Sequence, residues 1–154
     1  MAKASGTVAN ENGSNLETFI ENLLVKNGYL FVPKKKFEPA TYLKQPIYTK
    51  QFCVGTSIYE TELFCDFIIY HQDKYPLCLV IESKWQQSTG SVDEKYPFLV
   101  LNIKTRTPYK TVLLLDGQGY KAQAEKWLRD QVDDKLLHVF NMSEFQKWTN
   151  KGNI

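Results

Sequence analysis

Apolar side chains along the chain form helical repeats in some segments and short continuous runs in others. Between 15 and 27 they recur at intervals of three and four, a spacing typical of an amphipathic helix; the residues are Leu16, Phe19, Ile20, Leu23 and Leu24. Ser14 stands three positions before Glu17, which is the spacing of a capping box, and Asn27-Gly28 suits a helix end. We therefore expect the first helix at 15–27, with Ser14 as its N-cap.

Three segments rich in aromatic and β-branched residues follow at 47–54, 62–70 and 77–84, and each predicts a strand. The polar stretch 71–76 suits the turn of a hairpin between the last two. The region from 29 to 46 holds three prolines and is expected to be a loop. The first helix is thus followed by a meander of three strands.

Helical and strand patterns alternate in the second half. Ser91, followed three residues later by Glu94, predicts the start of a helix at 91–103. We expect strands at 110–115 and 136–140, a helix at 122–132, and a last helix at 142–148 that begins at Ser143. A meander followed by alternating helices and strands predicts an α/β fold, with a mixed central sheet flanked by helices.

The composition indicates the number of domains but says little about the function. The chain has 154 residues, of which 43% are hydrophobic, and this is enough to close one core. Residues 1–13 are small and polar, so we expect a flexible tail followed by a single domain at 14–154. A formal net charge of +2 is too small to identify a nucleic-acid binder. No apolar run suits a membrane span or a signal peptide, so we expect a cytoplasmic protein.

Cysteines and histidines offer no recognisable metal site. Cys53, Cys65 and Cys78 lack the paired spacing of zinc ligands, so they are expected to be reduced thiols. His71 and His138 also lack ligand spacing, and we expect structural roles for both.

The candidate chemistry lies on the hairpin. Glu82 and Lys84 are two residues apart on the expected strand 77–84, so their side chains project from the same face. Asp66 interrupts an apolar run on the neighbouring strand, where an unpaired carboxylate is costly. An antiparallel pairing would bring Asp66 beside Glu82, so that two carboxylates and an amine converge.

Such a set suits the hydrolysis of a phosphodiester bond. The carboxylates of Asp66 and Glu82 are ligands that Mg²⁺ prefers, and Mn²⁺ is expected to substitute. The ion would withdraw charge from the phosphate, while the Lys84 ammonium would orient the attacking water or stabilise the developing negative charge. A Glu-x-Lys on a strand is often only surface charge, but the apolar surroundings of Asp66 favour a functional site.

Asp66 followed by the stretch IESK at 81–84 resembles the motif of the PD-(D/E)XK nuclease superfamily, with Cys65 in place of the motif's proline. The stretch IESKWQQSTGSVDEKYPFLVLNI is similar to restriction-endonuclease-like members, and the order of elements resembles their αβββαβ core. The resemblance covers about 14–140 and implies a Mg²⁺-dependent endonuclease that acts on DNA. It also implies that Glu17 faces the metal site and that Gln86 contacts the site or DNA.

Some residues keep two interpretations. Glu17 could serve only as a helix cap. Lys34, Lys35 and Lys36 form either a solvated charge run or a loop that contacts DNA phosphates. Trp85 and Trp127 are expected to pack in the core.

The expected function is type II restriction-endonuclease-like cleavage of DNA. The alternatives are a structure-specific nuclease similar to Holliday junction resolvases, and a non-catalytic DNA-binding module on the same fold. We expect a homodimer, because one site of this kind cuts one strand and two sites around a two-fold axis cut both. Candidate dimer surfaces are the segment Tyr96-Pro97-Phe98 and the region 29–55.

Overall fold

The computed structural model describes residues 5–86 and 93–154. Within these residues, six strands form one mixed sheet in which the order in space follows the order in sequence. The strands are β1 (Leu30–Phe31), β2 (Ile47–Thr56), β3 (Glu62–His71), β4 (Tyr75–Trp85), β5 (Lys110–Asp116) and β6 (Leu136–Phe140). β3 runs antiparallel to both β2 and β4, whereas the other neighbours are parallel. All five strands predicted from the sequence are present, and β1 is an additional short one.

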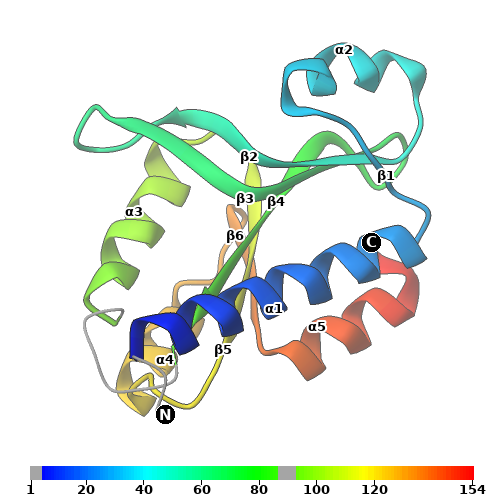
Figure 1. Ribbon diagram of the computed structural model, residues 1–154. Coiled ribbons are helices and arrows are strands. Elements are labelled where there is room, and N and C mark those ends of the chain that lie inside the picture. Colours follow the sequence, from blue (N-terminus) through cyan, green and yellow to red (C-terminus); the bar gives the residue numbers. More distant parts are fainter. Residues whose placement is uncertain (1–4, 87–92) are drawn as a thin grey trace.

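Helices cover both faces of the sheet (Figure 1). The α-helices are α1 (Ser5–Lys26), α2 (Phe37–Ala40), α3 (Tyr96–Thr105), α4 (Ala122–Asp130) and α5 (Met142–Trp148). Shorter turns are η1 (Lys34–Lys36), η2 (Thr41–Leu43), η3 (Asp93–Lys95) and η4 (Thr149–Asn153). α1 and α5 lie side by side on one face, while α3 and α4 lie on the other. The mixed sheet flanked by helices confirms the predicted fold class.

The first helix is longer than its sequence pattern predicts. α1 begins at Ser5, so residues 5–13, which we expect from the sequence to form a tail, are helical; residues 1–4 lie outside the described part of the chain. Ser14 is therefore inside the helix and is not its N-cap, and its carbonyl accepts a hydrogen bond from Thr18 Oγ1 at 2.9 Å. Once the apolar half is anchored on the sheet, each added residue gains a backbone hydrogen bond without a new nucleation cost.

Short helical turns replace much of the loop expected between 29 and 46. η1, α2 and η2 follow one another, and Phe37 at the start of α2 is 1% exposed. Phe37 packs on a small apolar cluster beneath α2 that includes Ile47, Cys65 and Val80. The burial of this aromatic ring explains why a lysine-rich and proline-rich stretch still folds against the sheet.

The second half follows the predicted alternation closely. α3 begins at Tyr96 after the single turn η3, and Pro97 stands in its first turn, where no backbone donor is required. The N-cap predicted at Ser91 lies outside the described residues. α5 begins at Met142, and Asn141 is its N-cap because its side chain accepts from the Glu144 amide at 2.8 Å.

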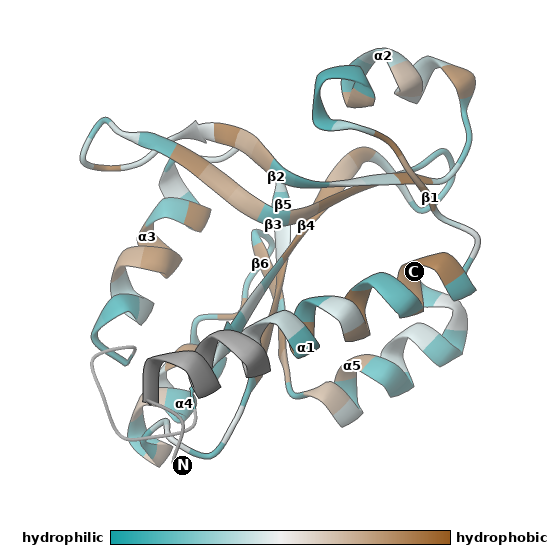
Figure 2. Cartoon of the chain, in the orientation of Figure 1, coloured by the Kyte–Doolittle hydropathy of each residue, from teal (hydrophilic) through white to brown (hydrophobic). Residues whose placement is uncertain are grey.

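Two larger apolar clusters fill the space between the sheet and the helices α1, α3, α4 and α5. The cluster under α1 and α5 includes Leu16, Ile20, Leu24, Phe67, Ile81 and Phe145. The cluster under α3 and α4 includes Tyr96, Val100, Ile103, Leu113, Leu128 and Val139. Figure 2 shows hydrophobic residues along most of the central strands, whereas the helices alternate between hydrophilic and hydrophobic positions. This division agrees with the amphipathic patterns read from the sequence.

Three aromatic side chains of the second half differ in burial. Trp127 was expected in the core but is 39% exposed, because α4 turns Leu128 inward instead. Trp85 packs partly buried against the cluster under α1, as expected. Tyr96 is 1% exposed, so it is part of the core and does not supply the dimer surface proposed for the segment 96–98.

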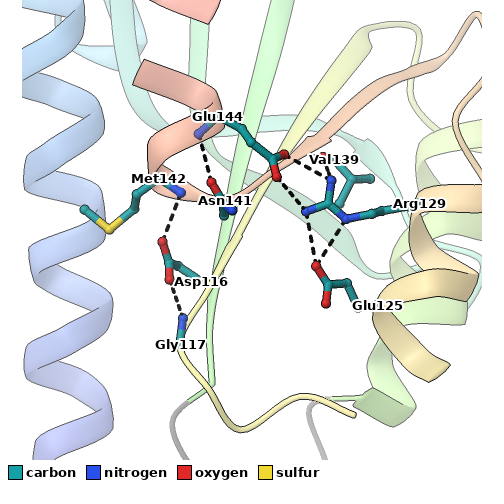
Figure 3. A network of polar contacts seen from close by, with 8 residues as sticks. All are labelled: Asp116, Gly117, Glu125, Arg129, Val139, Asn141, Met142 and Glu144. Carbon is teal, nitrogen blue, oxygen red and sulfur yellow. Dashed lines mark hydrogen bonds and ion pairs between the residues drawn. The ribbon is translucent and has the colours of Figure 1, made fainter. Parts of the chain in front are cut away.

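Polar contacts join α4 and α5 to the end of β5 (Figure 3). Arg129 of α4 forms ion pairs with Glu144 of α5 at 3.0 Å and with Glu125 at 3.1 Å. Asp116 at the end of β5 accepts a hydrogen bond from the Met142 amide at 2.9 Å. These contacts fix the start of α5 relative to the parallel half of the sheet.

No helix of the described residues is both long enough and apolar enough to cross a membrane.

Backbone hydrogen bonds hold the segment after β5 against the end of β4. The Gln86 amide donates to the Asp116 carbonyl at 3.0 Å, and the Gly119 amide donates to the Gln86 carbonyl at 2.7 Å. Gly117 adopts φ +100, and a Cβ there would lie 2.1 Å from the Gln86 carbonyl oxygen. Only glycine fits this close approach.

We predict that Gly117→Ala lowers the free energy of unfolding by about 3 kcal/mol, because the new methyl group meets backbone as well as an unfavourable φ. Gly28→Ala is the matched control: Gly28 has φ +88 but open space around it, so about 1 kcal/mol is expected. Urea unfolding followed by circular dichroism measures both. Equal losses in the two variants would contradict the close approach at Gly117.

Candidate active site

Asp66 lies where β3 and β4 separate. The paired residues of the two strands end at Phe67 and Ile81, and beyond that point β4 continues alongside β5 only. The Ser83 amide, which has no β3 carbonyl to bond, donates instead to Asp66 Oδ2 at 2.8 Å. The Ser83 hydroxyl donates to the same oxygen at 3.1 Å. Asp66 is thus held by two donors at the fork of the strands.

Glu82 and Lys84 occupy the same face of β4, as their spacing predicted. Both line a single pocket, and Lys84 Nζ lies 3.8 Å from Glu82 Oε2. Glu82 is 8% exposed, an unusual position for a carboxylate. Burial raises the pKa of Glu82 to about 8, and the Asp66 carboxylate adds to this rise while Lys84 opposes it. The structure therefore brings Asp66, Glu82 and Lys84 together.

Glu17 projects from α1 toward the same charges. Burial is the main cause of its raised pKa, the Asp66 carboxylate also raises it, and Lys50 and Lys84 lower it. Since Ser14 is not an N-cap, the capping-box interpretation of Glu17 is wrong. Glu17 belongs instead to the electrostatic surroundings of Asp66 and Lys84.

Gln86 and the three lysines are placed differently. Gln86 is 4% exposed, and its side-chain amide donates to the Gly119 carbonyl at 3.1 Å, so it holds the segment after β5. Lys34, Lys35 and Lys36 are exposed in η1. Lys34 Nζ stands 5.9 Å from the ring centre of Phe64 on β3, within the range of a cation–π contact.

Sequence reasoning missed Ser83 and Lys50. Ser83 lies between Glu82 and Lys84 on the opposite side of an ideal strand, and only the fork of β3 and β4 gives it access to Asp66. Lys50 on β2 pairs with Glu21 of α1 at 2.9 Å. No sequence signal identifies either contact, because both join elements that are distant along the chain.

The histidines have structural surroundings. His71 Nδ1 accepts from the Asp73 and Lys74 amides at 3.2 Å, which stabilises the β3–β4 turn. His138 stacks on Phe140 with ring centres 4.8 Å apart, and burial lowers its pKa. Neither residue lines the pocket of Glu82 and Lys84.

The pair of Asp66 and Glu82 suits a hard divalent cation. Two carboxylates in a poorly hydrated place repel each other, and the pKa of Glu82 is raised mainly by burial and further by this repulsion from Asp66. In the described residues, no group of three or more His, Cys, Asp or Glu side chains forms a metal cage. Mg²⁺ does not need one, since one or two carboxylates with water and substrate phosphate usually hold it.

A comparison with protein-family models agrees with the motif on β3 and β4. The model described as PD-(D/E)XK nuclease superfamily domain matches residues 8–153, which is nearly the whole chain. Searches of curated proteins and of solved structures gave no significant match. Since the family match, the mixed sheet flanked by helices and the meeting of Asp66, Glu82 and Lys84 agree, the chain belongs to the PD-(D/E)XK nuclease superfamily.

Proposed function

We propose that the protein is a metal-dependent DNA endonuclease of the restriction-endonuclease-like kind. The observation that carries this proposal is the meeting of Asp66, the buried Glu82 and Lys84 at the fork of β3 and β4. Membership of a nuclease superfamily supports hydrolysis of a nucleic acid. DNA as the substrate and Mg²⁺ or Mn²⁺ as the ion are parts of the proposal.

Asp66 and Glu82 would hold the ion, which when bound supplies Lewis acidity toward a phosphate oxygen. Ser83 occupies Oδ2 of Asp66 and so fixes the direction in which the carboxylate presents its other oxygen. Lys84 is partly exposed and lies 3.8 Å from Glu82, close enough to reach the same phosphate. Its ammonium would orient the attacking water or stabilise the negative charge that develops on the phosphate.

Glu17 and Gln86 have supporting roles in this proposal. The Glu17 carboxylate adds a third negative charge near Asp66 and would help to attract the cation. Gln86 positions the end of β4 through Gly119, which keeps Lys84 in place, so we assign it a positioning role. Lys34, Lys35 and Lys36 would contact DNA phosphates from η1.

Cleavage of both strands of a duplex would require two copies of this site. We therefore retain a homodimer as part of the proposal, with the region 29–55 as the candidate surface. Tyr42 and Leu43 in this region are 86% and 72% exposed, which leaves apolar area to be covered.

We predict that hydrolysis of plasmid DNA requires Mg²⁺ or Mn²⁺. Ca²⁺ should support binding with little cleavage, because it accepts the same oxygens with looser geometry and weaker Lewis acidity. Gel assays of supercoiled plasmid with each ion and with EDTA measure this. Undiminished cleavage in EDTA would remove the metal from the mechanism.

We predict that Lys84→Ala and Asp66→Asn each lower kcat/KM by about 10²-fold or more, because both act on charge in the transition state. Asn at position 66 can still accept from the Ser83 amide, so the fold should persist. Lys147→Ala, which removes an exposed lysine from α5, is the matched control and should cleave normally. Wild-type rates in either site variant would refute this assignment of the site.

We predict that Glu17→Gln raises the Mg²⁺ concentration needed for half-maximal cleavage, since it removes one carboxylate near Asp66. Stability should change by less than about 0.5 kcal/mol because Glu17 caps no helix end. Metal titrations of cleavage and urea unfolding test the two statements. The control Asp134→Asn removes an exposed carboxylate elsewhere, and an identical metal dependence in both variants would exclude Glu17 from the site.

A further inference from the structure

A mostly apolar pocket of about 230 Å³ adjoins the proposed metal ligands. Glu82 and Lys84 form one wall, and the opposite wall belongs to α3 and the residues just before it. The residues that shape it are Phe64, Lys95, Phe98, Leu99 and Asn102. Hydrolysis of the charged sugar–phosphate backbone does not itself require an apolar pocket beside the metal ligands. The pocket is therefore a candidate binding site for another, apolar part of the substrate.

Asn102 lines this pocket with a buried side-chain amide. Its side chain is almost fully buried at 1% exposure, and its Oδ1 accepts from the Ile58 amide at 2.9 Å. Its Nδ2 has no hydrogen-bond partner among the described residues. A buried donor without a partner is costly, so an acceptor that reached Nδ2 from the pocket would be stabilising.

Phe64 connects this pocket with a basic surface. It is 45% exposed on β3, and it also lines a second hollow that includes Lys34 and Lys35. Lys34 stands over its ring at 5.9 Å. Cationic side chains therefore lie on both sides of an exposed aromatic ring, with Lys84 and Lys95 on one side and η1 on the other.

The tip of the β2–β3 hairpin is attached to α3, the helix that lines the pocket. Tyr59 at the tip stacks on Phe98 with ring centres 5.2 Å apart and planes 21° apart. The Asn102 bond to Ile58 holds the same tip. The pocket is thus preformed by contacts within the chain, which lowers the ordering cost of binding.

We propose that this pocket binds one unstacked nucleobase, from the nucleotide whose phosphate lies at Glu82 and Lys84. The base would stack against Phe64 or Phe98, and the Asn102 amide would donate to a ring nitrogen or a carbonyl oxygen of the base. The inference rests on the proposed function and narrows its substrate. The preferred DNA contains an unpaired or easily extruded nucleotide at the cleavage position.

The size and chemistry of the pocket fit this ligand. An apolar cavity of about 150 Å³ accommodates benzene, so the hollow beside Lys84 has room for a single base but not for a folded peptide segment. The flanking lysines suit the phosphates on either side of the base. A base in a paired duplex cannot enter the pocket, because its faces are stacked on its neighbours.

The test compares binding of two labelled strands of equal length by fluorescence anisotropy with Ca²⁺ present. One is an oligothymidylate and the other is an abasic deoxyribose phosphate strand with the same charges but no bases. We expect the wild type to favour the thymidylate strand about tenfold. Phe64→Ala should abolish this preference and leave affinity for the abasic strand unchanged.

Further variants separate the parts of the pocket. Phe64→Leu keeps apolar bulk but no ring, and it should lose most of the preference. Asn102→Asp keeps the acceptor for Ile58 and removes the donor to the base, so the preference should fall by part of its value, about threefold. Trp127→Ala removes an aromatic side chain of similar exposure from α4, away from the pocket and from the region 29–55, and should have no effect. Circular dichroism shows that each variant is folded.

Equal wild-type affinity for the two strands, or an unchanged preference in Phe64→Ala, would overturn the base pocket. Cleavage assays with Mg²⁺ on a duplex with and without one unpaired base are run in parallel. Metal-dependent cleavage without a base preference would leave the nuclease proposal intact and remove the pocket proposal. A base preference that depends on Phe64, without cleavage of any DNA, would support the pocket and remove the nuclease proposal.

Discussion

At the fork of β3 and β4, a side-chain carboxylate takes the place of a backbone acceptor. Ser83 must satisfy its amide after β4 leaves β3, and Asp66 Oδ2 accepts that hydrogen bond at 2.8 Å. The separation of the strands therefore holds Asp66 in an otherwise apolar place and leaves space for Glu82 beside it. The proposed active site depends on this constraint, because a continued ladder would close the gap in which the charged groups meet.

Contacts elsewhere in the fold hold β4 in place beyond the point where it separates from β3. β4 stays aligned through its parallel pairing with β5, and Gln86 fastens the end of β4 to the segment around Gly117. On the other side, α1 packs its apolar residues on the sheet and carries Glu17 toward Asp66. A rigid frame of this kind suits catalysis by positioned charge, since the groups need little reorganisation when substrate arrives.

Charge and apolar surface alternate around the fork. Glu82 is buried with a pKa raised to about 8, while Lys84 on the same face borders both the carboxylates and the apolar pocket under the β2–β3 hairpin. Phe64 then leads from that pocket to the lysines of η1. A nucleic acid presents the matching alternation of phosphate and base, so one surface would serve both hydrolysis and recognition.

The sequence alone predicted five of the six strands of the described residues, the α-helices other than α2, and the shared face of Glu82 and Lys84. Helical and strand periodicities arise from local geometry, and the two-residue spacing of Glu82 and Lys84 places them on one face of any strand. Only the tertiary structure decided the surroundings of Glu17 and Gln86, the partner of Ser83 and the exposure of Trp127. These depend on which elements pack together, and contacts between distant segments leave no period in the sequence. The pocket around Asn102 likewise exists only where α3 meets the β2–β3 hairpin, because its walls come from segments far apart along the chain.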